Sequence, residues 1–338
     1  MKKLILVSWA LMAAHFSGAQ EKKQYEVKNF KGLVNITGPS SGLVIEGYAG
    51  NSVIIEAEGG EGKVPEKAAG LRMVTAGGVD NTGISARVEE ETVKVVTSIN
   101  EKGEEKEEEI RVLTINIPNA NKLFKNYVIK VPHGVMTRFR ESHMGYWGGK
   151  EPMQVRSFEG ELEVSCTGCN MNISDFSGNI IANNSSYGGT THIEFSKLAQ
   201  DKISSINTDG DVEVILPAST KANLTMNSTR GNAYTDFELK KVEKKTGNDR
   251  LDAVIVNGLS SFSSSGDAIS VGQGNINFRS DEGVTVVGQR ARVNEKLALA
   301  SVSATRRRNL DRYDYTINDG GVYFSITSFS GNVYLKKK

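Results

Sequence analysis

The sequence predicts an all-β protein whose short strands repeat as a right-handed β-helix or similar β-solenoid. One phrase recurs along the chain: an aromatic residue, one further residue, a glycine, and then alternating apolar and polar residues. Complete copies of the phrase begin at Phe30, Phe158, Phe176 and Phe329. A repeated turn and strand can bury its apolar side only against a neighbouring copy, so this repetition indicates a repetitive β architecture.

The spacing of glycines is the second observation that predicts this fold. In looser copies of the phrase, Gly189, Gly210 and Gly231 lie 21 residues apart. This period fits a coil of about 20 residues per turn. Other glycines are spaced by about 8 to 12 residues, which also fits an antiparallel meander or sandwich. The fixed period and the identical phase favour the solenoid.

Within a copy, the apolar residues fall two and four positions after the glycine. The pairs are Leu162 and Val164, Val212 and Val214, and Val333 and Leu335. Side chains alternate along a strand, so each pair points to one face. The aromatic residues two positions before the glycine are expected to fill the core. Helical periodicity is nearly absent, and only Pro65–Leu71 and Phe195–Gln200 suggest a turn or two of helix.

Residues 1–19 have the features of a signal peptide. Lys2 and Lys3 precede an apolar run from Leu4 to Phe16, and Ser17-Gly18-Ala19 forms a small-residue cleavage site. The run is short for a membrane span, although an uncleaved anchor is the alternative. The sequence therefore predicts an exported chain, in the periplasm or at the cell surface, with no transmembrane segment after cleavage.

Two β regions follow the signal peptide and are expected to be continuous. The N-terminal β region covers residues 20–125 and contains β-branched runs such as Val53–Ile55 and Val112–Ile117, with a charged hairpin tip at Glu101–Glu109. The β-solenoid region covers residues 126–338. It is interrupted by polar insertions at 239–250 and 288–312, and the final Lys336-Lys337-Lys338 is expected to keep an open sheet edge from pairing with other chains.

Charge and residue types exclude several function classes. The chain has 41 lysines and arginines against 40 acidic residues, and this near-neutral balance argues against nucleic acid as a partner. No histidine pair has metalloprotease spacing and no nucleophile elbow occurs. Asp175, Asp209, Asp211 and Asp236 lie near turns, where aspartate is an ordinary residue. We therefore expect no enzyme activity, no cofactor and no metal.

Cys166 and Cys169 are the two cysteines of the chain. Outside the cytoplasm they could form a disulfide. The alternative is that they are two small strand residues beside a turn glycine, since buried free cysteines behave as small hydrophobes.

The stretch from Arg138 to Gly149 is the candidate binding surface. It combines two arginines with a glycine-rich loop that holds a histidine and two aromatics: Arg138, Arg140, His143, Tyr146 and Trp147. Exposed aromatics beside arginine are typical of binding surfaces. The alternative is that the loop caps one end of the fold and buries Trp147. The expected partner is a glycan or an envelope protein.

Three segments resemble a known family. Ser204–Ala218 is similar to the S-x-x-G-D-V-x-V-x-L-P signature of DUF4097, the "putative adhesin" family, and Tyr127–Pro132 is similar to an earlier strand-plus-proline element of that family. Ser328–Leu335 is similar to that family and to the related auto-transporter adhesin head domain. The resemblance implies a right-handed β-helix-like fold in exported bacterial proteins, and it brings no catalytic residues. The expected function is a non-enzymatic adhesin or binding module of the cell envelope. The alternatives are a carbohydrate-active enzyme on a β-helix and a structural envelope protein.

Overall fold

The structure is a computed structural model of the full chain. It describes residues 22–59, 66–68, 70–71, 74–75, 78–99, 105–118, 124–142, 151–185, 188–200, 202–242, 262–264, 267–272, 275–277 and 314–338. The predicted signal peptide lies outside these residues. Within the described residues, no helix is long and apolar enough to cross a membrane.

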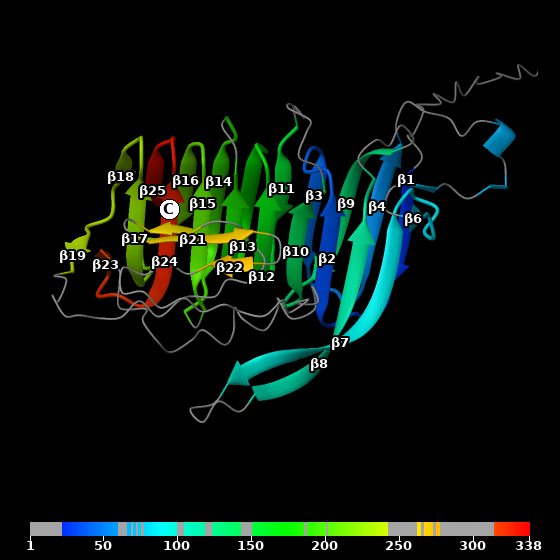
Figure 1. Ribbon diagram of the computed structural model, residues 1–338, viewed down its shortest axis with the longest axis horizontal. Coiled ribbons are helices and arrows are strands. Elements are labelled where there is room, and N and C mark those ends of the chain that lie inside the picture. The colour runs from blue at the N-terminus through cyan, green and yellow to red at the C-terminus, as the bar shows by residue number, and fades with distance from the viewer. Residues whose placement is uncertain are drawn as a thin grey trace, which may run out of the picture.

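The all-β prediction is confirmed. Twenty strands join in one long, curled sheet, and most of them divide into two ladders of parallel strands (Figure 1). In spatial order, the first ladder contains β8 (Glu105–Asn116), β2 (Leu33–Gly38), β10 (Met136–Glu141), β12 (Glu159–Cys166), the second half of β13 (Met171–Asn184), β15 (Ser204–Thr208), β24 (Val322–Ser328) and β17 (Ala222–Ser228).

The second ladder runs beside the first, and the chain passes from one to the other at each turn. In spatial order it contains β9 (Phe124–Pro132), β3 (Leu43–Tyr48), β11 (Met153–Arg156), the first half of β13, β14 (Thr191–Leu198), β16 (Val212–Leu216), β25 (Val333–Lys337) and β18 (Ala233–Thr235). Repeats that are neighbours in space thus pair in parallel. The right-handed coil of the solenoid stays a prediction.

Antiparallel strands lie at the two ends of the sheet. They are β1 (Lys22–Val27) and β4 (Val53–Gly59) beside β9, β7 (Arg87–Ile99) beside β8, and β23 (Tyr315–Ile317) with β19 (Lys240–Lys241) beside β17. Two small sheets are not hydrogen-bonded to the long sheet. One consists of β5 (Val74–Thr75) and β6 (Gly78–Val79), and the other consists of β20 (Phe262–Ser264), β21 (Asp267–Gly272) and β22 (Asn275–Asn277). A 3-10 turn, η1, covers Glu66–Ala68.

The core follows from the alternation of side chains along the strands. Leu162, Val164, Val333 and Leu335 are each at most 2% exposed, as their positions after the glycine predict. The aromatic residues before the glycine behave in two ways. Phe158 and Phe176 are buried and stack with ring centroids 6.0 Å apart, and the row continues through Phe195 and Phe324. Phe329, by contrast, is 40% exposed.

Turn glycines let neighbouring repeats approach closely. A Cβ placed on Gly178 would lie 1.9 Å from the carbonyl oxygen of Gly160, and the φ of Gly178 is +148°. A Cβ on Gly210 would lie 2.0 Å from the carbonyl oxygen of Gly189. Both distances are far below van der Waals contact, so only glycine fits where these turns stack.

The order of strands in space differs from their order in the chain. β24 and β25, red in Figure 1, lie among green strands, because β24 pairs with β15 and β17 while β25 pairs with β16 and β18. The expectation that Lys336-Lys337-Lys338 protects an open sheet edge is therefore wrong, since β25 is an internal strand.

The expectation of a helical turn at Phe195–Gln200 is also wrong. Phe195 belongs to β14 and its ring packs in the aromatic row.

Candidate functional site

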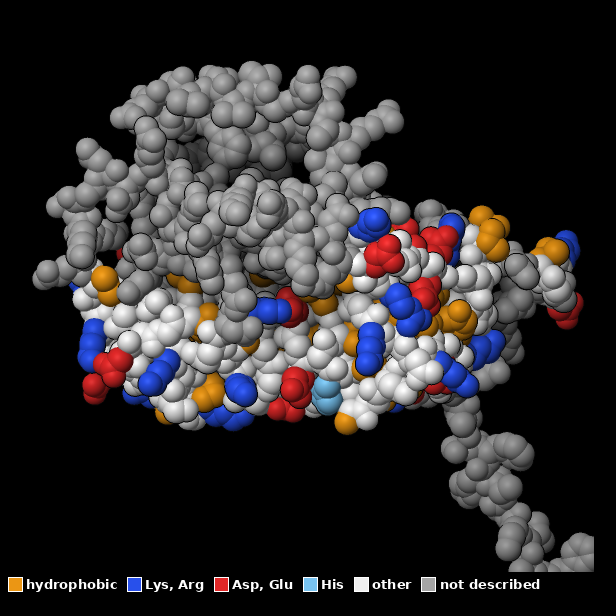
Figure 2. Space-filling model, turned by 90° about the horizontal axis from the view of Figure 1, so that it is seen from below, with side chains coloured by type: hydrophobic (Ala, Val, Ile, Leu, Met, Phe, Trp, Pro, Cys, Tyr) orange, Lys and Arg blue, Asp and Glu red, His pale blue; other side chains and the backbone are white. Residues whose placement is uncertain are grey.

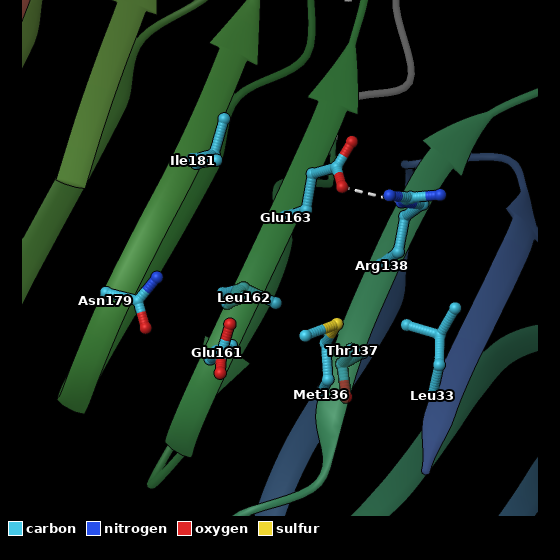
Figure 3. A pocket seen from close by; sticks show the side chains of 9 residues that line it. All are labelled: Leu33, Met136, Thr137, Arg138, Glu161, Leu162, Glu163, Asn179 and Ile181. Carbon is cyan, nitrogen blue, oxygen red and sulfur yellow. Dashed lines mark hydrogen bonds and ion pairs between the residues drawn. The ribbon is translucent and has the colours of Figure 1, made fainter. Parts of the chain in front are cut away.

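The predicted arginines lie on β10, but Arg138 is not exposed. Its side chain is 6% exposed and its Nε donates a hydrogen bond to Glu163 Oε2 at 2.6 Å. The guanidinium of Arg140 is 3.9 Å from the same carboxylate. Figure 3 shows Arg138 turned toward Glu163 on the neighbouring strand. Arg138 therefore holds β10 to β12 more than it offers a contact to a ligand.

A shallow pocket lies beside this ion pair. Its lining includes Leu33, Met136, Glu161 and Asn179 in addition to the pair (Figure 3). Its volume of about 30 Å³ has room for about two water molecules. The pocket is thus too small for a sugar or a cofactor.

The rest of the predicted surface, His143, Tyr146 and Trp147, lies outside the described residues. β10, the strand that precedes these residues, ends at a position that neighbouring turns hold in place. Glu141, at the end of β10, accepts hydrogen bonds from the Ser40 hydroxyl at 2.6 Å and the Thr167 amide at 2.7 Å. Thr167 belongs to the turn in which Cys166 and Cys169 form a disulfide. This corner therefore joins three turns of the sheet.

Three of the four turn aspartates accept hydrogen bonds from neighbouring groups. Asp175 accepts a hydrogen bond from the Ser196 hydroxyl at 2.6 Å, and hydrogen bonds from Ser196 and Ser157 lower the pKa of its carboxyl. The carboxylates of Asp211 and Asp236 accept backbone amide hydrogens of Asn332 and Lys337. Within the described part of the chain, no group of three histidine, cysteine or acidic residues could hold a metal ion.

A different row of side chains stands out on the outer face of the second ladder. Strands β11, β13, β14, β16, β25 and β18 place one residue each at the same level, in direct register. We call this row the polar strip: Gln154, Asn172, His192, Glu213, Tyr334 and Tyr234. Their side chains are exposed or half-buried, because on β11, β13, β14, β16 and β25 the neighbouring residues point inward and are buried.

The middle of the polar strip is an electrostatic cluster. His192 Nδ1 lies 2.8 Å from Glu213 Oε2, and Lys336 donates a hydrogen bond to the other oxygen of Glu213. The bonds from Lys336 and His192 outweigh burial and lower the pKa of Glu213. An ionised carboxylate only accepts, so Nδ1 carries the proton and Nε2 is the ring nitrogen left to meet a ligand.

The end of the polar strip is aromatic. The rings of Tyr234 and Tyr334 stack with centroids 5.4 Å apart and planes inclined by 12°. Tyr234 is 50% exposed. Acidic and basic side chains are interspersed over the described part of the side seen in Figure 2. The strip as a whole can donate and accept hydrogen bonds and can stack a ring, along a row fixed by the register of hydrogen-bonded strands.

Sequence reasoning missed the polar strip although a signal was present. His192, Glu213, Tyr234 and Tyr334 each lie three positions after a repeat glycine. At His192, Glu213 and Tyr334 that position lies between two buried residues of the strand, so it points away from the core. The register of the repeats then aligns these four residues, which a search for catalytic or metal-binding motifs does not examine.

Comparison with known proteins gives one distant likeness. No family model and no curated protein matches the sequence. A crystal structure of a "putative cell adhesion protein" from Clostridium sporogenes is similar with a TM-score of 0.37 and 10% sequence identity, over 94% of this chain and 100% of that chain. A likeness this distant assigns neither a family nor a function.

Proposed function

We propose that the protein is an exported, non-enzymatic β-solenoid that acts as a binding or adhesion module at the bacterial cell envelope. The polar strip is the observation that supports this proposal. It presents hydrogen-bonding groups and an exposed tyrosine along a rigid parallel sheet. A rigid surface loses little conformational freedom when it binds, so even individually weak contacts add to affinity.

The surroundings of the acidic side chains support binding over catalysis. Glu213 is held by Lys336 and His192 on an open sheet face, and Asp175, Asp211 and Asp236 are occupied by hydroxyl or amide donors. A catalytic acid or base is usually tuned toward neutral pH in a cleft. The pKa of Glu213 and that of Asp175 are instead lowered, which keeps both groups ionised.

Three features support export. Residues 1–19 have the charge, apolar run and small-residue site of a signal peptide. The disulfide between Cys166 and Cys169 is the form that cysteines adopt in an oxidising compartment. The adhesin-like resemblance of Ser204–Ala218 points in the same direction.

The test is binding of the labelled chain, without residues 1–19, to intact bacterial cells and to isolated envelope fractions, with released sugars assayed in parallel. We expect saturable retention and no released products. Released products would replace the binding role with a carbohydrate-active enzyme. Absence of retention on every fraction would overturn the proposal in favour of a structural protein. Trp147→Ala in the same assay tests the surface predicted from the sequence.

A further inference from the structure

We propose that the polar strip binds a neutral, extended oligosaccharide, an inference that rests on the binding role proposed above. Its six side chains come from neighbouring strands. Five intervals of about 4.8 Å give a row about 24 Å long. A regular row with a repeat close to the length of one sugar residue fits an extended chain of such units. A β-1,4-linked oligosaccharide forms such a chain.

The chemistry of the strip changes along its length. At one end, the amides of Gln154 and Asn172 offer both donors and acceptors, which suit hydroxyl and acetamido groups of a sugar. In the middle, His192 is half-buried and its Nδ1 is bonded to Glu213, so Nε2 is the ring nitrogen that can accept a hydrogen bond from a sugar hydroxyl. At the other end, Tyr234 and Tyr334 stack on each other in nearly parallel planes, and the half-exposed ring of Tyr234 offers an aromatic face on which the apolar face of a sugar ring can stack.

The charges around the strip favour a neutral ligand. Lys336 is paired with Glu213, Lys338 with Glu194 at 2.7 Å, and Arg156 with Glu46 at 2.6 Å, although Arg156 and Lys338 remain about half exposed. Opposite charges therefore cancel within each pair. Such a surface provides no strong field of one sign to attract an ionised chain.

The test is isothermal titration of the chain, without residues 1–19, using N-acetylchitohexaose as the probe. Maltohexaose is the control for shape, because its α-1,4 linkages make it curve away from a straight row. We expect N-acetylchitohexaose to bind and maltohexaose to bind at least tenfold more weakly.

Variants of the strip show where the probe binds. Tyr234→Ala is expected to raise the Kd about tenfold, and Asn172→Ala about fivefold. Phe329→Ala removes a comparably exposed aromatic outside the strip and is expected to leave the Kd unchanged. Thermal unfolding of each variant checks that the fold is retained, which is expected because both strip residues are exposed.

Each negative outcome has a separate meaning. An unchanged Kd in both strip variants, or equal affinity for maltohexaose, overturns the strip as the oligosaccharide site. Binding of the chain to cell envelopes without binding to either oligosaccharide also overturns this inference, and leaves the binding module of the previous section intact. Failure to bind envelopes at all removes the proposed function itself.

Discussion

Replacement of Phe176 by alanine should remove a large part of the folding free energy. Phe176 is fully buried, stacks on Phe158 at 6.0 Å and meets Phe195 edge to face at 5.2 Å. Truncation of a buried phenylalanine costs about 3–5 kcal/mol. We expect the upper part of that range, about 4–5 kcal/mol, because hydrogen-bonded strands on both sides prevent the cavity from collapsing. The total free energy of unfolding of a typical protein is only about 5–15 kcal/mol.

The measurement is the midpoint and the slope of the urea unfolding transition of Phe176→Ala. Phe329→Ala is the matched control, because Phe329 has the same position in the repeated phrase but is 40% exposed, with its ring 4.6 Å from the guanidinium carbon of Arg230. That contact is worth about 0.5–1 kcal/mol. Similar losses in the two variants would refute the conclusion that burial, and not the repeated phrase, determines the contribution of the aromatic residue.

Three further perturbations test the turns, the ion pairs and the charge cluster. Gly210→Ala should prevent a stable native state, measured by far-ultraviolet circular dichroism, because its Cβ would lie 2.0 Å from a backbone oxygen; a native spectrum with unchanged melting would contradict this. Arg138→Ala should cost about 3 kcal/mol in urea unfolding, whereas Arg87→Ala, which breaks an exposed pair with Glu89, should cost at most about 1 kcal/mol. The pKa of Glu213 is lowered in the folded protein, so its ionised carboxylate stabilises the fold at pH values above the ordinary pKa of 4.5. This stabilisation is lost as the pH falls through the lowered pKa, so the difference in stability between the protein and Glu213→Gln should shrink on acidification. A constant difference between about pH 3 and 7 would contradict the linkage.

Local alternation made the core predictable from the sequence. Leu162 and Val164 are separated by one polar residue, and the pleat of a strand alone decides that they share a face. The glycines of the phrase were equally informative, because the stacked turns exclude a Cβ at Gly178 and Gly210. These properties depend on a few consecutive residues, which is why they could be recognised without knowing which strands pair.

Pairing between distant repeats could not be predicted in the same way. Gly210 and Gly231 have the correct spacing for adjacent turns, yet Gly331 lies between them, with its Cβ position 2.2 Å from the carbonyl carbon of Gly210. All copies of the phrase present similar edges, so the sequence of one copy does not specify its neighbour. The polar strip depends on this choice of partner, because Tyr334 reaches Glu213 and Tyr234 only when β25 is internal.

Local sequence patterns also could not predict which charged side chain is buried. Arg138 and Arg140 occupy alternate positions of β10 and look alike in the sequence, but Arg138 aligns with Glu163 on β12. The resulting ion pair buries Arg138 to 5% exposure. Tyr234, the exposed aromatic of the polar strip, lies in a loose copy of the repeat without unusual composition.

The internal position of β24 and β25 has a kinetic consequence. Ser328 contacts Gly210 across 118 positions of the chain, and Asn223 contacts Gly321 across 98. Closing a loop of about 100 residues costs about 4 kcal/mol of chain entropy before any contact repays it. The pair β17 and β18 is synthesised earlier but cannot join the ladders until β24 and β25 have arrived. Folding should therefore contain a slow late phase. Until β24 and β25 pair with them, the edges of β15 and β16 remain unpaired and can aggregate with other chains.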